Sequence, residues 1–204
     1  GALTAEDNIL IHNVGGGVGL AALEIAKQIG ATVYGTASPG KHEFLKQKGL
    51  DHAIDYRNND WENELKNLTN GRGVELIIDP IGGNHWRKSY RSLRSTGRLG
   101  MFGISAASDS SWQGKIKLLK TALQMPFFHP INLMNTNKAV FGVNMGHLWH
   151  ENTKIRQWMN KILEGVEAGW ISPHVDKSFS FDKAAEAHQY IEDRKNKGKV
   201  VLVP

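Results

Sequence analysis

The stretch Asn8-Ile-Leu-Ile-His-Asn-Val-Gly-Gly-Gly-Val-Gly19 decides the fold. Its apolar start predicts a buried strand over 8–13. Residues 18–29 carry apolar side chains at helical spacing and stop at Gly30, which predicts a helix. Glycines between a strand and a helix permit a tight turn, where backbone N–H groups and the positive end of the helix dipole can approach a pyrophosphate. The stretch therefore predicts a β-turn-α unit that binds a nucleotide.

The same alternation of apolar runs and amphipathic stretches continues along the chain. It predicts further strands over 31–36, 52–55, 74–79, 97–102 and 139–143. It predicts further helices over 40–48, 61–68, 86–93 and 152–168. Strands that alternate with helices through short turns pair in parallel and carry helices on both faces. The predicted fold class is therefore α/β, with a doubly wound, six-stranded parallel sheet.

Two regions depart from this alternation. The first is 105–138, where we expect a helix over 112–123 and irregular chain after it. The second is the C-terminal end, where a strand over 178–180, a helix over 181–193 and a strand over 199–203 follow a complete six-strand set. These last elements are expected to belong to something beyond the sheet.

Composition excludes several classes of protein. The net charge of +5 comes from 25 basic residues interleaved with 20 acidic ones, which does not favour a nucleic-acid partner. The chain has no cysteine, so disulfides and thiolate-bound zinc are excluded. No apolar run approaches the roughly 20 residues of a membrane span, and no signal peptide is visible, so we expect a cytoplasmic protein. Because the chain begins Gly1-Ala2 and enters a strand at once, we expect a fragment.

The end of the second strand indicates which nucleotide is bound. NAD sites commonly place Asp or Glu there, on the ribose hydroxyls. This chain has Thr36-Ala-Ser38 instead, followed by Lys41. With no carboxylate to repel a 2′-phosphate and a lysine able to bind it, NADP(H) is the predicted cofactor. If an acidic residue were present at the end of this strand, Lys41 would be interpreted as an ordinary surface lysine.

At this point the chain resembles the medium-chain dehydrogenase/reductase superfamily, in its zinc-independent quinone oxidoreductase and VAT-1-like branch. The resemblance rests on segments in the family's order: 9–22, Gly35-Thr-Ala-Ser38 with Lys41, Ile54-Asp-Tyr56, Asp79-Pro-Ile-Gly-Gly83, 97–103 and Gly198-Lys-Val-Val-Leu-Val-Pro204. Val14 departs from the alcohol-dehydrogenase form of the motif, which has glycine there. The resemblance implies an oxidoreductase that transfers hydride between NADPH and a quinone or an activated alkene or carbonyl, without zinc or another metal.

The resemblance also assigns cofactor-binding positions along the chain. The pyrophosphate turn would be Gly16, Gly17, Val18 and Gly19. The 2′-phosphate would be met by Ser38, Lys41, Tyr56 and Arg194. The nicotinamide and its ribose would be flanked by Asp79, Phe102, Gly103, Phe141, Gly142 and Val143. No residue is assigned a catalytic role.

Members of this branch carry an N-terminal GroES-like catalytic domain before the point where this chain starts. We therefore expect residues 1–170 to be an NADP(H)-binding Rossmann domain, and 171–204 to be elements that pack with the missing domain. Such a fragment would bind cofactor but turn over little substrate. The resemblance also implies a homodimer formed through the edge of the sixth strand, and a small-molecule substrate that this chain does not identify.

Several interpretations stay open. Asp79 is expected to cap the following helix, to contact ribose, or both. His147 and His150 are expected to be surface or packing residues rather than metal ligands, and 125–134 to form a substrate-cleft wall or a subunit contact. The rival functions are a non-catalytic nucleotide-binding scaffold or sensor, and a methyltransferase-like fold. The latter commonly places an acid at the end of the second strand.

Overall fold

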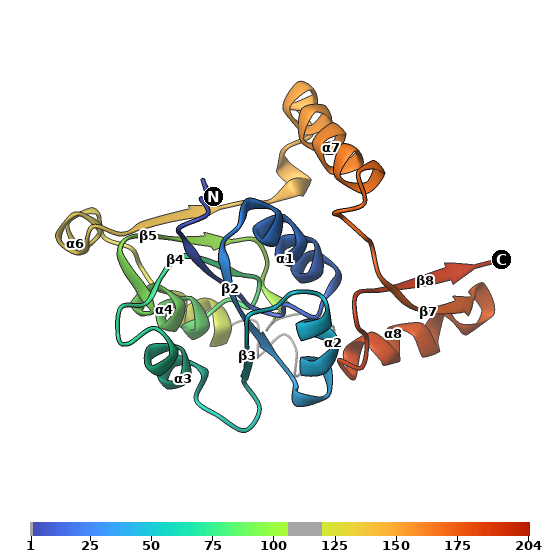
Figure 1. The fold of residues 1–204 in the computed structure, drawn as a ribbon, viewed down its shortest axis with the longest axis horizontal. Coiled ribbons are helices and arrows are strands. Elements are labelled where there is room, and N and C mark those ends of the chain that lie inside the picture. Colours follow the sequence, from blue (N-terminus) through green and yellow to red (C-terminus); the bar gives the residue numbers. More distant parts are fainter. Residues whose placement is uncertain (1, 106–119) are drawn as a thin grey trace.

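A six-stranded parallel sheet forms the centre of the computed structural model, which describes residues 2–105 and 120–204 (Figure 1). The strand order is β3-β2-β1-β4-β5-β6. The strands are β1 Asn8–Ile11, β2 Thr32–Ala37, β3 His52–Asp55, β4 Val74–Asp79, β5 Leu93–Met101 and β6 Ala139–Gly142. This order, with all pairs parallel, is that of a doubly wound dinucleotide-binding sheet, so the predicted fold class is confirmed.

Helices cover both faces of the sheet. They are α1 Gly17–Ile29, η1 Pro39–Lys41, α2 His42–Gln47, α3 Trp61–Leu68 and α4 Asn84–Arg91. Successive residues of a strand point to opposite faces. Ile9 and Ile11 of β1 accordingly pack with the α1 side chain Leu23, and Leu10 between them packs with Leu65 of α3. One apolar cluster thus lies on each face of the sheet. Buried polar residues lie instead at the carboxyl ends of the strands, among them His12, Thr36 and Asp79.

The largest boundary difference lies between β4 and β5. The sequence predicts a helix over 86–93 and a strand from 97, whereas α4 ends at Arg91 and β5 starts at Leu93. Gly82 and Gly83 have positive φ and turn the chain into the helix two residues early. The pairing of β4 with β5 also shifts register between Val74 and Leu76, so β5 includes residues that the pattern assigned to a turn.

Between β5 and β6 the chain forms α6 Pro130–Thr136, and after β6 it forms η3 Met145–His147 and α7 Asn152–Glu167. The C-terminal part then forms a separate small sheet with its own helices: β7 Val175–Ser180, η4 Phe181–Lys183, α8 Ala184–Glu192 and β8 Lys199–Val203. β7 pairs with β8 in parallel. The expected helix over 112–123 lies outside the described residues except for its end, 120–123, which is helical.

Helix α7 stands apart from the sheet in Figure 1. One stripe of it is apolar and between 39% and 50% exposed: Trp158, Met159, Ile162, Leu163 and Val166. Of the described helices, none is long and apolar enough to cross a bilayer.

Candidate functional site

The glycine turn joins β1 to α1. A Cβ at Gly19 would lie 2.4 Å from the carbonyl oxygen of Asn13, so only glycine lets the helix approach the strand this closely. The N–H groups of a helix's first turn have no acceptor within the helix. In this part of the chain no side chain caps them, and the first turn of α1 contains no acidic residue. The turn therefore offers free N–H groups and a positive dipole end to an anion, as a pyrophosphate requires.

A basic group lies beyond the carboxyl ends of β2 and β3. Lys41 is only 9% exposed, and its Nζ donates to the backbone carbonyl of Asn196. Burial lowers the pKa of Lys41, against the opposing charges of Tyr56 and Asp176. Lys41 is therefore a buried residue and not an ordinary surface lysine.

Tyr56 and Arg194 meet beside Lys41. Nη1 of Arg194 donates to the hydroxyl of Tyr56 at 3.4 Å, from a segment 138 residues away. Burial alone would raise the pKa of Tyr56, but the hydrogen bonds from Arg194 and Arg57 outweigh it and hold the pKa below its usual value. Ser38 precedes this group as the half-buried N-cap residue of η1. The structure thus brings together the residues predicted for the 2′-phosphate.

The residues predicted for the nicotinamide lie at, or directly after, the carboxyl ends of the adjacent strands β4, β5 and β6. The N–H of Val143 donates to the carbonyl of Met101 at 2.9 Å, which extends the pairing of β6 with β5. The Phe141 ring lies over Gly100, where a Cβ would come within 2.7 Å of it. Phe102 and Gly103 leave β5 next to the Asp79-Pro80 turn, to which Phe102 N–H donates.

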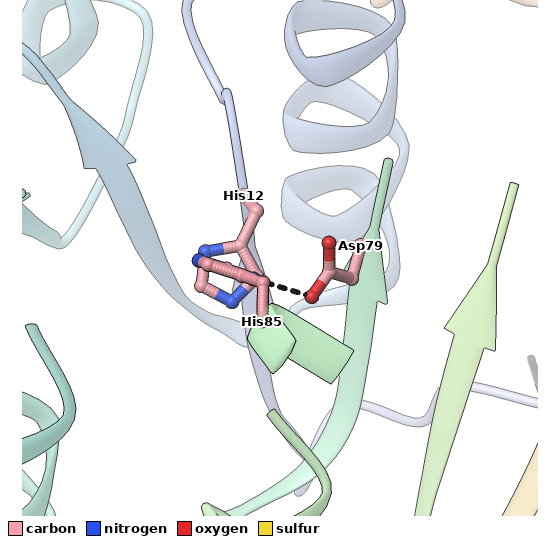
Figure 2. A group of neighbouring side chains, drawn as sticks. All are labelled: His12, Asp79 and His85. Carbon is pink, nitrogen blue, oxygen red and sulfur yellow. Dashed lines mark hydrogen bonds and ion pairs between the residues drawn. The ribbon is translucent and has the colours of Figure 1, made fainter. Parts of the chain in front are cut away.

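Asp79 belongs to a buried polar network that the sequence interpretation did not identify. Figure 2 shows the imidazoles of His12 and His85 beside its carboxylate. Asp79 Oδ2 accepts from His85 Nδ1 and from the Ser89 hydroxyl, each at 2.7 Å, and Oδ1 accepts from the N–H of Ile81 at 2.8 Å. Asp79 is 0% exposed. It stabilises the turn after β4 and does not cap α4, whose N-cap is Gly83. A ribose contact would need this side chain to move.

Hydrogen-bond counting fixes the tautomer of His12. The Ser89 hydroxyl gives its proton to Asp79, so its oxygen must accept from His12 Nε2, 3.2 Å away. His12 Nδ1 then accepts from the Thr36 hydroxyl at 3.1 Å. Burial lowers the pKa of His12 to about 3, although the charge of Asp79 opposes the shift. His12 is therefore neutral and links the ends of β1, β2 and β4.

The carboxylate of Asp79 is ionised. Burial alone would raise its pKa, but the hydrogen bond from His85, the nearby imidazoles and the hydrogen bond from Ser89 lower it overall. His12, Asp79 and His85 are also the one group among the described residues whose ligand atoms, all within 4.8 Å of one another, could hold a metal ion. Every one of these atoms on His12 and Asp79 already has a hydrogen-bond partner. A polar residue inside the apolar run Asn8–Asn13 was the signal for His12 in the sequence.

Other residues singled out in the sequence lie elsewhere. His147 and His150 are exposed, and His150 Nε2 lies 3.9 Å from Glu151 Oε1. The segment 125–134 packs against α4, where the Phe128 and Tyr90 rings lie 5.2 Å apart. A cavity of about 140 Å³ lies between them, lined by Arg87, Tyr90, Pro126, Phe127, Phe128, His129, Asn132 and Leu133. The role of the segment 125–134 as a substrate-cleft wall or a subunit contact stays a prediction.

The sequence is similar to a protein family and to several characterised proteins. A family model described as zinc-binding dehydrogenase matches residues 48–202. The chain is 33% identical over 205 residues to the synaptic vesicle membrane protein VAT-1 homolog of Homo sapiens, covering 100% of this chain and 52% of that protein. It is 28% identical over 207 residues to a 2-haloacrylate reductase of Burkholderia sp., covering 97% of this chain and 56% of the reductase. The chain thus spans about half the length of these relatives.

A solved structure shows the same fold with a cofactor. The mycobacterial protein Rv1454c, complexed with NADPH, superposes with a TM-score of 0.80 at 26% identity. The match covers 100% of this chain and 59% of that one.

Proposed function

Because the chain belongs to the zinc-binding dehydrogenase family, in the VAT-1 and quinone oxidoreductase-like branch of the medium-chain dehydrogenases/reductases, we propose that it is the NADP(H)-binding part of an oxidoreductase. The proposed reaction transfers hydride between NADPH and a quinone or an activated alkene or carbonyl. Residues 1–170 would form the nucleotide-binding domain. Residues 171–204 would pack with a catalytic domain, and the greater length of the relatives is compatible with such a domain.

The observation that carries this proposal is the group at the end of β2. Thr36, Ala37 and Ser38 provide no carboxylate, while Lys41 and Arg194 converge on Tyr56. The 2′-phosphate carries close to two negative charges near neutral pH, so the buried Lys41 and the exposed Arg194 would both favour its binding. The NADPH complex of a 26% identical structure supports the same choice.

The chain's own residues would hold the cofactor at three places. The N–H groups at the start of α1 would donate to the pyrophosphate, and Lys41, Tyr56 and Arg194 would bind the 2′-phosphate. The strand ends at Phe102-Gly103 and Phe141-Gly-Val143 would flank the nicotinamide. The bound NADPH supplies the hydride, and the protein orients it.

We propose that the reaction needs no zinc. The chain has no cysteine to bind the ion as thiolate. Within the described residues, the one possible ligand group is the network around Asp79, whose hydrogen bonds a metal would have to replace.

Activated alkenes are the substrate class with most support. A 2-haloacrylate is an alkene conjugated to a carboxylate, and the relative named for reducing it is 28% identical to this chain. We also propose a homodimer that forms through β6, since β6 ends the strand order of the sheet.

Hydride transfer is tested by mixing the protein with NADPH and either a quinone or an enone, and following the loss of reduced nicotinamide. Oxidation that depends on the acceptor supports the enzyme. Tight NADPH binding without oxidation by any acceptor would instead indicate a nucleotide-binding scaffold.

A further inference from the structure

A short segment of the C-terminal part lies across the nucleotide site. This segment, which we call the strap, comprises residues 194–198 and joins α8 to β8. Figure 1 shows the connection between these two elements beside α2. The N–H of Gly198 donates to the carbonyl of Gly15 at 2.8 Å, and Gly198 also pairs with Gly16 in an isolated parallel bridge. One end of the strap is therefore fixed to the glycine turn.

The rest of the strap lies against the residues proposed for the 2′-phosphate. Nη1 of Arg194 donates to the hydroxyl of Tyr56 at 3.4 Å, and the carbonyl of Asn196 accepts from Nζ of the buried lysine. Among the residues that the structure describes, this carbonyl is the one hydrogen-bond partner of the Lys41 ammonium group. Nδ2 of Asn196 donates to the carbonyl of Gly198 at 2.9 Å, which fixes the shape of the strap itself. The position of the Lys41 ammonium group therefore depends on the strap.

The strap brings positive charges close together. Lys41 is only 9% exposed, and the neutral carbonyl that it contacts compensates its charge less well than an anion would. Burial is the main reason that the pKa of Lys41 is lowered; the positive charges of Arg57 and Lys197 lower it further, and the nearby acidic groups oppose the shift. Arg194 is a further cation, which the strap itself carries. An anion bound among these groups would remove their repulsion and stabilise the strap in this position.

The strap leaves α8 through a residue with an unfavourable backbone conformation. Arg194 has a φ of 56°, in the left-handed region where glycine is favoured at the end of a helix. This conformation turns the chain, so that the strap runs back toward the nucleotide site. A glycine would make the same turn without strain, but it would have no side chain to reach Tyr56. The arginine thus adds a positive charge to the site at a cost in backbone energy.

We propose that the 2′-phosphate of NADP(H) holds the strap closed over the nucleotide site. The phosphate would accept hydrogen bonds from Lys41, which the nucleotide-binding part provides, and from Arg194, which the strap provides, and so join the two. NAD(H) lacks this phosphate, so the strap opens more often when NAD(H) is bound. Asn196 is a positioning residue, because it acts on the phosphate through Lys41. The inference rests on the proposed function and goes beyond it, since it links the choice of cofactor to the order of the C-terminal part.

Limited digestion with trypsin measures how often the strap opens, because a protease cleaves the open form of a segment. The strap contains three trypsin sites, after Arg194, Lys195 and Lys197. The whole chain is digested alone and with NADPH, NADH or adenosine 2′,5′-bisphosphate, each at a concentration that calorimetry shows to be saturating. Mass spectrometry identifies the cleaved bonds. NADPH and the bisphosphate should slow cleavage in the strap about tenfold, the value of one charge-assisted hydrogen bond, and NADH should slow it much less.

Cleavage after Arg72 is the control, because Arg72 lies exposed in the turn between α3 and β4. A cofactor that stabilised the whole chain without acting on the strap would slow cleavage there by the same factor. That result overturns the inference, as does equal protection of the strap by NADH and NADPH, or a strap that is not cleaved in the free chain. If the wild-type chain binds neither cofactor, the proposed function fails and the inference with it.

Asn196→Ala tests the positioning role of this residue. The variant keeps the main-chain carbonyl but loses the hydrogen bond to Gly198 that shapes the strap. Calorimetry should show that NADPH binds about fivefold more weakly, the value of one ordinary hydrogen bond, while NADH affinity is unchanged. A merely structural role would not alter the ratio of the two affinities. Asn160→Ala, on an exposed residue of α7, is the matched control, and thermal unfolding identifies any loss of folding. An unchanged ratio in Asn196→Ala would overturn the role of Asn196.

Discussion

His85 donates a hydrogen bond from Nδ1 to the carboxylate of Asp79 at 2.7 Å, where β4 ends and the turn to α4 begins. This bond couples the first turn of α4 to a strand end that faces the proposed nicotinamide site. The Ser89 hydroxyl and the Ile81 N–H donate the other two hydrogen bonds to the same carboxylate. The network therefore holds the backbone at the end of β4 in place through a side chain that is itself 0% exposed.

Replacing Asp79 with alanine should therefore destabilise the fold. The change leaves the Ile81 N–H, the Ser89 hydroxyl and His85 without their acceptor inside the protein. We expect the free energy of unfolding to fall by about 3 kcal/mol or more, as when one partner of a buried charged pair is removed. Urea unfolding measures it. Asp182→Ala, on an exposed residue, should change stability by no more than about 0.5 kcal/mol; equal effects of the two would contradict the network's role.

Acid should destabilise the fold through His12. Its pKa is about 3 in the folded chain, against 6.5 for an unburied histidine. The unfolded chain therefore binds more protons between these values, and stability falls as the pH drops from 6.5 toward 3. Linkage gives a loss of roughly 2 kcal/mol between pH 7 and pH 5. The lowered pKa of Asp79 acts in the same direction at still lower pH.

Unfolding of wild type and His12→Asn at pH 7 and pH 5 tests this contribution. Asparagine retains a hydrogen-bond acceptor but does not titrate. The variant should be less stable at pH 7 and should lose roughly 2 kcal/mol less than wild type on acidification. A pH dependence identical in both proteins would show that His12 is not buried as a neutral base.

The glycine turn should tolerate no methyl group at Gly19. A Cβ there meets backbone atoms of Asn13 and Val14 within 2.7 Å. Gly19→Ala should cost about 1–3 kcal/mol of stability, as overpacking does, and should weaken NADPH binding because α1 must shift. A Cβ at Gly40 meets nothing within 4 Å, so Gly40→Ala serves as the control and should leave stability nearly unchanged. A Gly19→Ala protein with unaltered stability would contradict the close packing of this turn.

The homodimer proposed through β6 predicts a dimeric mass in solution. An edge strand presents unpaired backbone groups that can join a second copy. Light scattering at micromolar concentration should give twice the chain mass of 22.6 kDa. A mass of one chain would overturn the proposal.

The sequence predicted the sheet well because apolar periodicity and glycine positions act locally. β3, α3, β4 and β8 have the predicted bounds, since each is set by its own residues and flanking turns. The start of β5 could not be predicted in the same way. Leu93 enters the strand by pairing with Val74 across a register shift, which is a tertiary contact.

The site was predicted residue by residue but not as an arrangement. Lys41 stood out because an acid was missing, yet its burial depends on Asn196, 155 residues away. The network around Asp79 joins His12 to α4 through Ser89, 77 residues on, and no local pattern indicates that pair. Such contacts arise when β1 and β4 become neighbours in the folded sheet.

The choice of NADP(H) over NAD(H) is decided by calorimetric titration of wild type and Lys41→Met with NADPH and with NADH. Wild type should prefer NADPH by at least tenfold, about the value of one charge-assisted hydrogen bond. Lys41→Met should lose most of this preference while its affinity for NADH is unchanged. Equal affinities of wild type for the two cofactors, or a preference that survives in Lys41→Met, would contradict the choice of NADP(H).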